Sequence, residues 1–249
     1  MALPKAVTRA EAKTWKANWQ GRSDQDLPDV FSTAEIKRVF VYALYGDLLD
    51  AFLAPYTKYR VPRLRVHPAS SSDPTIAAPL FHPLLELIDG EKVPNLQAAA
   101  LYAPVPVDRV ISVPETVPDT ADGRILPEEA EKMVNIWRGF TAAKLPMVFT
   151  DSETQRPNKR LEFYSFTPAA TQNILDGLQD RRFDTLYIYL GIKTAELMQK
   201  YQDDSRILFT FIVEPGNSVT GQLAAQQRSG GDGGGQYDFG RPCPEYCET

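Results

Sequence analysis

The feature that most restricts the fold is an amphipathic segment that occurs twice. Residues 8–19 and 126–137 align without a gap, and Trp19 matches Trp137 in this alignment. In both segments the apolar side chains recur at helical spacing, which predicts two equivalent helices with one buried face each. Such self-similarity indicates that one small unit occurs twice along the chain.

Shorter blocks extend the repeat, and each pair of blocks has the same predicted structure. They are residues 31–40 with 166–175, a strand end running into a capped helix, then 63–67 with 185–189 and 96–104 with 207–215, both strand pairs. An inserted helix is predicted over residues 79–87 in the first copy and 194–201 in the second. We therefore predict an α+β fold in which two divergent copies of a small mixed α/β unit pack together.

This organisation divides the chain into four parts. The first repeat covers residues 1–111, a linker rich in Pro and turn formers covers 112–124, and the second repeat covers 125–217. Residues 218–249 form a tail whose glycine-rich composition predicts flexibility.

Composition narrows the class of protein. The 249 residues carry 27 Lys and Arg against 32 Asp and Glu, a net charge of -5, which does not favour nucleic acid as a partner. No apolar stretch approaches the roughly 18 residues that cross a bilayer, and the first residues lack the apolar core of a secretory signal. We expect a soluble cytoplasmic protein without a membrane span.

The second half of the chain carries a resemblance. Its motifs are the helix Glu-Glu-Ala-Glu-Lys-Met-Val-Asn-Ile-Trp-Arg, the strands Thr-Leu-Tyr-Ile-Tyr-Leu-Gly and Ile-Leu-Phe-Thr-Phe-Ile-Val, and the ending Asp-Phe-Gly-Arg-Pro-Cys-Pro-Glu-Tyr-Cys. In these motifs the chain from residue 126 onward resembles a group of short Bacteroidetes proteins without a known activity. The resemblance implies a bacterial source and a genuine module, and it supplies no catalytic residue.

Cys243 and Cys247 are the only cysteines, and three residues separate them. This spacing suits a small disulfide, two thiolate ligands of a shared metal, or an intermolecular bridge. Two thiolates are half of a tetrahedral zinc shell, and His67 and His82 lie far away in the sequence. We predict no metal and no other cofactor, and keep both cysteines as candidate redox or intermolecular contacts on a structural tail.

Aromatic residues supply the candidate interaction surface. Tyr187 and Tyr189 alternate with aliphatic residues on a predicted strand, so one face of that strand is aromatic. That face could pack a helix or bind a partner. Tyr237 and Phe239, in the tail, extend the candidate surface.

No catalytic motif occurs in the sequence: no nucleophile elbow surrounds a serine, and no paired-histidine metal motif exists. His67, expected at a strand end, and His82, expected near a helix start, are predicted to be structural. The basic segment 156–160 is predicted to be a solvated turn. A catalytic site would need a cluster such as His67, Asp184 and Glu214.

Function is argued from a site, and the sequence predicts none that is catalytic. The leading hypothesis is a non-enzymatic protein-interaction or structural module of a larger assembly, which binds a protein partner or a second copy of itself. The alternative is a small-molecule sensor with its ligand in a cleft between the copies, for which a polar pocket at that junction is the discriminating feature. An enzyme of unrecognised type is the third hypothesis.

Overall fold

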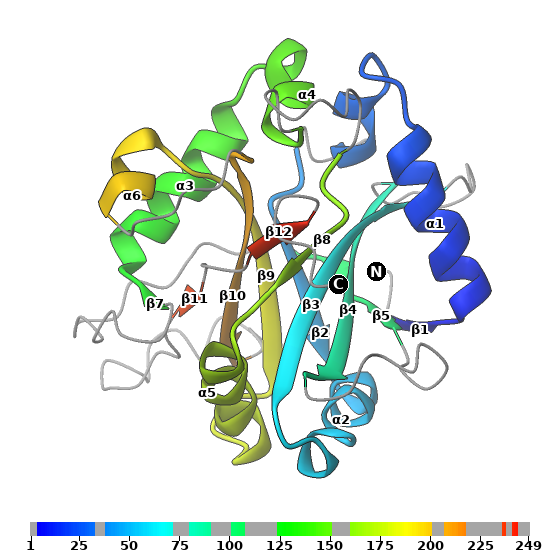
Figure 1. Cartoon of the computed structure of the whole chain (residues 1–249), viewed down its shortest axis with the longest axis vertical. Helices are drawn as coiled ribbons and strands as arrows, with labels where there is room; N and C mark the ends of the chain where they lie inside the picture. Colours follow the sequence, from blue (N-terminus) through cyan, green and yellow to red (C-terminus); the bar gives the residue numbers. More distant parts are fainter. Residues whose placement is uncertain are drawn as a thin grey trace.

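A computed structural model describes residues 4–32, 38–71, 80–90, 101–107, 124–150, 160–200, 207–217, 236–237 and 241–243. The described part of the chain contains helices and two six-stranded antiparallel sheets (Figure 1). The predicted α+β class is therefore confirmed.

The first sheet has the strand order β1-β5-β4-β3-β8-β12. These strands are β1 (Lys5–Val7), β3 (Pro62–Ser70), β4 (Phe81–Asp89), β5 (Leu101–Ala103), β8 (Phe163–Ser165) and β12 (Arg241–Cys243). The second sheet has the order β6-β2-β9-β10-β11-β7. Its strands are β2 (Val41–Tyr45), β6 (Val105–Pro106), β7 (Arg124–Ile125), β9 (Thr185–Ile192), β10 (Phe209–Gly216) and β11 (Gln236–Tyr237).

The two longest helices lie on opposite sides of the molecule, α1 against β3 and α3 against β9 (Figure 1). The helices are α1 (Arg9–Gly21), α2 (Asp47–Leu53), α3 (Pro127–Gly139), α4 (Leu145–Val148), α5 (Pro168–Gln179) and α6 (Ala195–Lys200). Short 3-10 helices are η1 (Leu27–Phe31), η2 (Tyr56–Lys58) and η4 (Ala142–Lys144). In the view of Figure 1, α2 and α5 lie together below the sheets and α4 lies above them.

Local sequence explains where α1 and α3 begin. The Thr8 hydroxyl accepts a hydrogen bond from the Glu11 N–H at 3.3 Å, and the Glu11 carboxylate accepts from the Thr8 N–H at 3.0 Å. This capping box satisfies backbone donors that have no partner within the helix. At the start of α3, Pro127 occupies a first-turn position that needs no donor.

The two halves of the chain exchange strands. The first sheet combines β1, β3, β4 and β5, from residues before 112, with β8 and β12 from residues after 124. The second sheet combines β7, β9, β10 and β11 with β2 and β6 from the first half. Each half therefore completes the sheet that the other half builds.

Read from corresponding edges, the two sheets have the same connectivity: β1-β5-β4-β3-β8-β12 in one and β7-β11-β10-β9-β2-β6 in the other. The registers agree as well. Tyr164 on β8 pairs with Val66 on β3, and Tyr42 on β2 pairs with Ile188 on β9. Tyr164 and Tyr42 therefore occupy corresponding positions in their sheets.

Several predicted elements are confirmed. Residues 8–19 and 126–137 contain the helices α1 and α3, and residues 194–201 contain α6. The strand blocks 63–67 and 185–189 lie in β3 and β9, which hold corresponding positions in the two sheets.

The predicted helix over residues 79–87 is wrong, because Phe81–Asp89 is the strand β4. Most of β4 is buried on both faces, so its apolar residues form a run that is interrupted by His82 and Glu86 and does not alternate regularly. Such a run fits a helix or a strand equally well. The strand that corresponds to β10 is accordingly β4, and the predicted match of residues 96–104 with 207–215 is also wrong.

The predicted match of 31–40 with 166–175 is wrong as well. Phe31 ends η1 rather than a strand, and β2 begins at Val41. Residues 33–37, where the capped helix was expected, lie outside the described residues. Of the predicted linker only Arg124 is described, and it belongs to β7. Within the predicted tail, β11 and β12 extend the two sheets.

Aromatic side chains fill the junction between the halves. Phe31 and Phe149 stack with ring centres 5.6 Å apart and planes within 3° of parallel. Trp19 meets the face of Phe149 edge-on at 5.0 Å, and Trp137 meets Phe31 in the same way at 4.9 Å. The buried members of this aromatic cluster are Trp19, Phe31, Phe81, Trp137, Phe149 and Phe209.

Matched hydrogen bonds tie each half to the helix of the other. The Trp19 indole N–H donates to the Leu161 carbonyl at 2.9 Å, and the Trp137 indole N–H donates to the Val39 carbonyl at 3.0 Å. Leu161 precedes β8 and Val39 precedes β2, and both strands belong to the sheet that is mainly built by the other half of the chain. A buried indole N–H needs such a partner.

Two arginines repeat this matched pattern at the ends of α1 and α3. Arg160 donates to the carbonyls of Trp19 and Arg22, and Arg38 donates to the carbonyls of Trp137 and Phe140. The last carbonyls of a helix have no hydrogen-bond partner within the helix. Each arginine therefore caps the C-terminal end of a helix that belongs to the other half of the chain. Arg160 is only 5% exposed, so the predicted solvated turn is wrong at this residue.

The stacked pair at the centre of the aromatic cluster makes a stability prediction. Phe31→Leu and Phe149→Leu should each lower the free energy of unfolding by about 1–3 kcal/mol. The double variant should lose about 0.5–1.5 kcal/mol less than the sum, because the shared stacking contact is lost only once. Denaturant unfolding of the four proteins of the cycle measures this.

Phe183→Leu supplies the control, because Phe183 packs beside Gly177 of α5 and is not part of the aromatic cluster. Its combination with Phe31→Leu should be additive within about 0.5 kcal/mol. Additivity of the Phe31 and Phe149 substitutions would contradict direct coupling across the junction.

Candidate functional site

The α1 face of the first sheet, meaning the face on which α1 packs, carries a group of polar side chains. Side chains alternate along β3, so Leu64 and Val66 enter the main core while Arg65 and His67 belong to the opposite face. On that face α1 packs through Trp15 in a small apolar cluster with Ala69 of β3. The polar group lies farther along the same strands.

His67 and Glu86 form a buried pair at the centre of the polar group. His67 is 6% exposed, and its Nε2 lies 2.8 Å from Oε2 of Glu86. Burial lowers the pKa of His67, although the hydrogen bond to Glu86 opposes this, so the ring is neutral at pH 7 and donates its Nε2–H. Burial alone would raise the pKa of Glu86, but the hydrogen bond from His67 and the positive charges of Lys16 and Arg65 lower it.

The strand registers arrange the polar side chains in rows across the sheet. Arg65 pairs with Glu86 on one side and with Ser165 on the other, and Ser165 pairs in turn with Arg241. Directly opposite residues of antiparallel strands project to the same face. The row Glu86-Arg65-Ser165 therefore crosses β4, β3 and β8, and the backbone position beyond it belongs to Arg241.

An aromatic ring supports this row. The Arg65 guanidinium lies 4.7 Å from the ring centre of Phe163, and the His67 ring lies 5.5 Å from it. Arg65 and Phe163 are both partly exposed. We call the side chains of Arg65, His67, Glu86, Phe163 and Ser165 the Arg65–Ser165 site.

Ser165 stands out within the Arg65–Ser165 site. Its residue is 8% exposed, and its Oγ is buried without a hydrogen-bond partner. Leaving a buried hydroxyl unsatisfied costs about 1–3 kcal/mol, so such atoms are rare in folded proteins. A bound acceptor or donor would remove this cost.

The corresponding positions of the second sheet hold residues that are buried. There Tyr187 stands opposite Glu214, as Arg65 stands opposite Glu86, and Tyr189 takes the place of His67. The Tyr189 hydroxyl donates to Glu214 at 2.6 Å. The exposed fractions are 3% for Tyr187, 0% for Tyr189 and 2% for Glu214.

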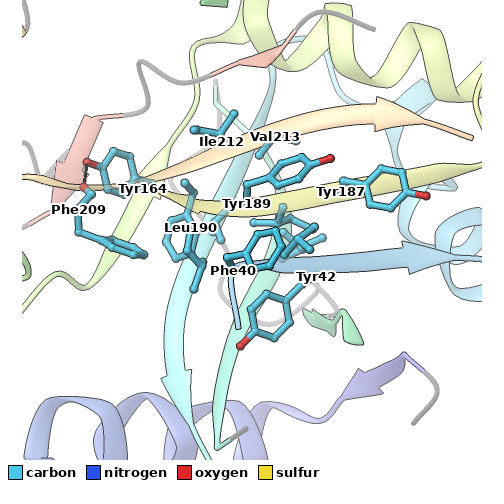
Figure 2. Packing of buried hydrophobic residues seen from close by; sticks show 14 of the residues in the cluster. Phe40, Tyr42, Tyr164, Tyr187, Tyr189, Leu190, Phe209, Ile212 and Val213 are labelled. Atoms are coloured by element: carbon cyan, nitrogen blue, oxygen red, sulfur yellow. Dashed lines mark hydrogen bonds between the residues drawn. The ribbon is translucent and has the colours of Figure 1, made fainter. Parts of the chain in front are cut away.

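Tyr187 and Tyr189 were expected to form an interaction surface, yet both are buried. Figure 2 shows them projecting from β9 within the packed interior, and the Tyr187 hydroxyl donates to the Asn217 carbonyl at 3.0 Å. The alternation that placed both rings on one face is present. That face packs internally, so the two tyrosines offer no exposed contact.

The tail residues of the sequence predictions are only partly described. Tyr237 lies on β11 and pairs with Val213, and Cys243 lies on β12 and pairs with Phe163. Phe239 and Cys247 lie outside the described residues. The predictions for the two cysteines remain predictions.

The hypothetical catalytic cluster is divided between the sheets. His67 is bound to Glu86 on the first sheet, whereas Asp184 accepts a hydrogen bond from the Thr185 hydroxyl at the start of β9. Glu214 accepts its hydrogen bond from Tyr189 on the second sheet. His67 lies inside β3 and not at its end, and His82 lies on β4 and not at the start of a helix.

The geometry of His67 bears on catalysis. A neutral histidine held by a carboxylate is the arrangement of a general base. A base acts on a nucleophile within hydrogen-bond reach, and the hydrogen bond of His67 is to Glu86, not to a hydroxyl or thiol of the described residues. Within the described ranges no group of three or more His, Cys, Asp or Glu side chains is arranged to hold a metal ion.

Sequence reasoning missed Arg65, Glu86, Phe163 and Ser165. The alternation of Arg63, Arg65 and His67 with aliphatic residues was the available signal, because it marks a strand with one polar face. The partners come from β4 and β8, and no sequence pattern shows that these strands flank β3.

Comparison of the chain with protein-family models, with curated proteins and with solved structures finds no match. No helix in the described ranges is both long enough and apolar enough to cross a membrane. The class of protein that these observations define is an α+β protein with two strand-exchanged sheets.

The buried ring of His82 predicts that the stability of the protein depends on pH. Its ring stacks on Trp15 with centres 4.6 Å apart, and burial, with a smaller effect of Lys5, lowers its pKa to about 4. The unfolded chain takes up this proton near pH 6.5, so the stability that neutral His82 contributes is complete above that pH and is lost as pH falls toward 4.

Between pH 7.5 and pH 5 this loss should amount to about 2 kcal/mol of unfolding free energy. His82→Gln should reduce the loss over this interval, as measured by urea unfolding at both pH values. An unchanged pH dependence in the variant would contradict a depressed pKa for His82.

Proposed function

We propose that the chain is a non-enzymatic protein-interaction module that meets its partner with the α1 face of the first sheet. The observation that carries the proposal is the difference between corresponding positions of the two sheets. Arg65 and Phe163 are partly exposed beside the hydrogen-bonded pair of His67 and Glu86, whereas Tyr187 and Glu214 are buried.

The second sheet allows a comparison of how the corresponding positions can be filled within one protein. It shows that a tyrosine–glutamate pair fills these positions with little exposure. Holding Arg65, His67 and Glu86 in the same positions requires the partial burial of charged groups, which is unfavourable for stability alone. A requirement other than stability accounts for them, and arginine and aromatic side chains are enriched at protein interfaces.

The other hypotheses have less support. A ligand between the copies would need a polar pocket at the junction, and the aromatic cluster fills that junction. An enzyme would need a nucleophile or metal beside His67, whose described partners are Glu86 and Phe163.

We also infer that the chain contains two divergent copies of one unit. The shared connectivity, the corresponding registers and the matched indole and arginine hydrogen bonds support a duplication. A bacterial source is part of the same proposal and rests on the resemblance carried by residues 126–249, whereas a cytoplasmic location is proposed from the sequence pattern alone.

Affinity purification of the tagged full chain from its native cells, with mass spectrometry and native mass, tests the proposed surface. The wild-type protein should carry a stoichiometric protein partner or a second copy of itself. Arg65→Ala and Phe163→Ala should each reduce the recovered partner at least about tenfold, as expected for central interface residues.

Arg182→Ala is the matched control, because its side chain is 57% exposed, pairs with Asp180, and lies between α5 and β9 outside both sheets. It should retain the partner, and circular dichroism should show native folding of all three variants. A partner retained by the Arg65 and Phe163 variants, or turnover by the pure protein, would overturn the proposal.

A further inference from the structure

We infer that the Arg65–Ser165 site binds an oxyanion, namely a carboxylate from an acidic segment of the protein partner. This inference rests on the proposed function and gives the chemistry that the partner must present. It is carried by three observations: a buried serine hydroxyl without a partner, an arginine held over an aromatic ring, and a basic stripe on the adjoining helix.

The Ser165 hydroxyl supplies a donor for which the described chain provides no acceptor. Its Oγ is buried and has no hydrogen-bond partner. Ser165 stands directly opposite Arg65 in the ladder between β3 and β8. A carboxylate between them would accept from the hydroxyl and from the guanidinium together.

Arg65 suits this role because its geometry is fixed before binding. Its guanidinium lies over the Phe163 ring at 4.7 Å, and a planar guanidinium presents several donors in a fork that matches a carboxylate. On the other side of Ser165 the ladder position belongs to Arg241 of β12.

The charge balance around the site favours an anion. Glu86 is the carboxylate of the site, and it already accepts a hydrogen bond from His67. The positive charges of Arg65 and of Lys16 on α1 both act on this pair. Although the whole chain has a net charge of -5, Arg65 and Lys16 place two positive charges beside this pair.

The stripe on α1 indicates a segment rather than a free ion. Arg9, Lys13 and Lys16 follow one another at helical spacing, and Arg9 and Lys13 are exposed. They extend over about 10 Å of helix, at 1.5 Å per residue. A peptide with several carboxylates can contact the stripe and the Arg65–Ser165 site together, whereas phosphate can occupy only one of them.

The test uses the purified full chain and three probes: a hexaglutamate peptide, a hexaglutamine peptide and inorganic phosphate. Isothermal titration calorimetry should show binding of hexaglutamate that weakens with added salt, and no binding of hexaglutamine. Ser165→Ala should weaken hexaglutamate at least about fivefold, and Arg65→Ala should weaken it further.

Ser165→Ala also separates binding from folding. Since the Oγ has no partner in the free protein, its removal should leave the melting temperature unchanged or slightly higher. Ser23→Ala is the matched control, because the Ser23 hydroxyl is already bound to Asp26 at 2.6 Å. It should bind hexaglutamate like the wild type.

Equal hexaglutamate binding by the wild type and Ser165→Ala would overturn the inference, as would equal binding of hexaglutamine or binding of phosphate alone. If hexaglutamate fails while partner capture still depends on Phe163, the oxyanion site is wrong and the interaction surface stands. If hexaglutamate binds through Ser165 but no partner is captured, the oxyanion site stands and the proposed protein interaction is wrong.

Discussion

The exchange of β2 and β8 between the sheets is the constraint on which the rest of the structure depends. β2 pairs with β9, and β8 pairs with β3, so each sheet contains a strand from the other half of the chain. A small α+β unit has limited apolar surface to bury, and the exchange creates one shared core that neither half has alone. The aromatic cluster, the indole hydrogen bonds and the helix-closing arginines all lie beside the exchanged strands. The strand exchange therefore determines both the connectivity of the two sheets and the shared core that stabilises them.

The helices α1, α3, α5 and α6 and the strands β3, β9 and β10 could be predicted from the sequence, because local periodicity determines them. Trp19 and Trp137, which align without a gap, lie on the helices α1 and α3. The aligned strand blocks lie in β3 and β9, which hold corresponding positions in the two sheets. β4 was mistaken for a helix, because a strand buried on both faces loses its alternation. The exchange of strands and the burial of Tyr187 depend on contacts between distant segments. The Arg65–Ser165 site was missed for the same reason, since its residues come from three strands.

The two sheets combine one connectivity with different chemistry. At corresponding positions the second sheet has Tyr187 and Glu214 closed within the protein, and the first has Arg65 and Glu86 near the surface. Two sheets of the same connectivity permit this division, because one sheet can fill the core while the other presents charged groups. The functional hypothesis follows from that contrast, since function belongs to sites and not to the fold. His67 illustrates the point: it is a paired and oriented group, and its described partners are Glu86 and Phe163.

Separate expression of residues 1–115 and 116–249 tests the strand exchange most directly. Each fragment lacks the strands that complete its sheet, so neither should form a stable folded monomer. Mixed or expressed together, the fragments should associate one to one and unfold in a single cooperative transition, as shown by native mass spectrometry and denaturant unfolding. A fragment that is monomeric, folded and cooperative by itself would contradict the account, because it would show that a half of the chain closes its own sheet without strands from the other.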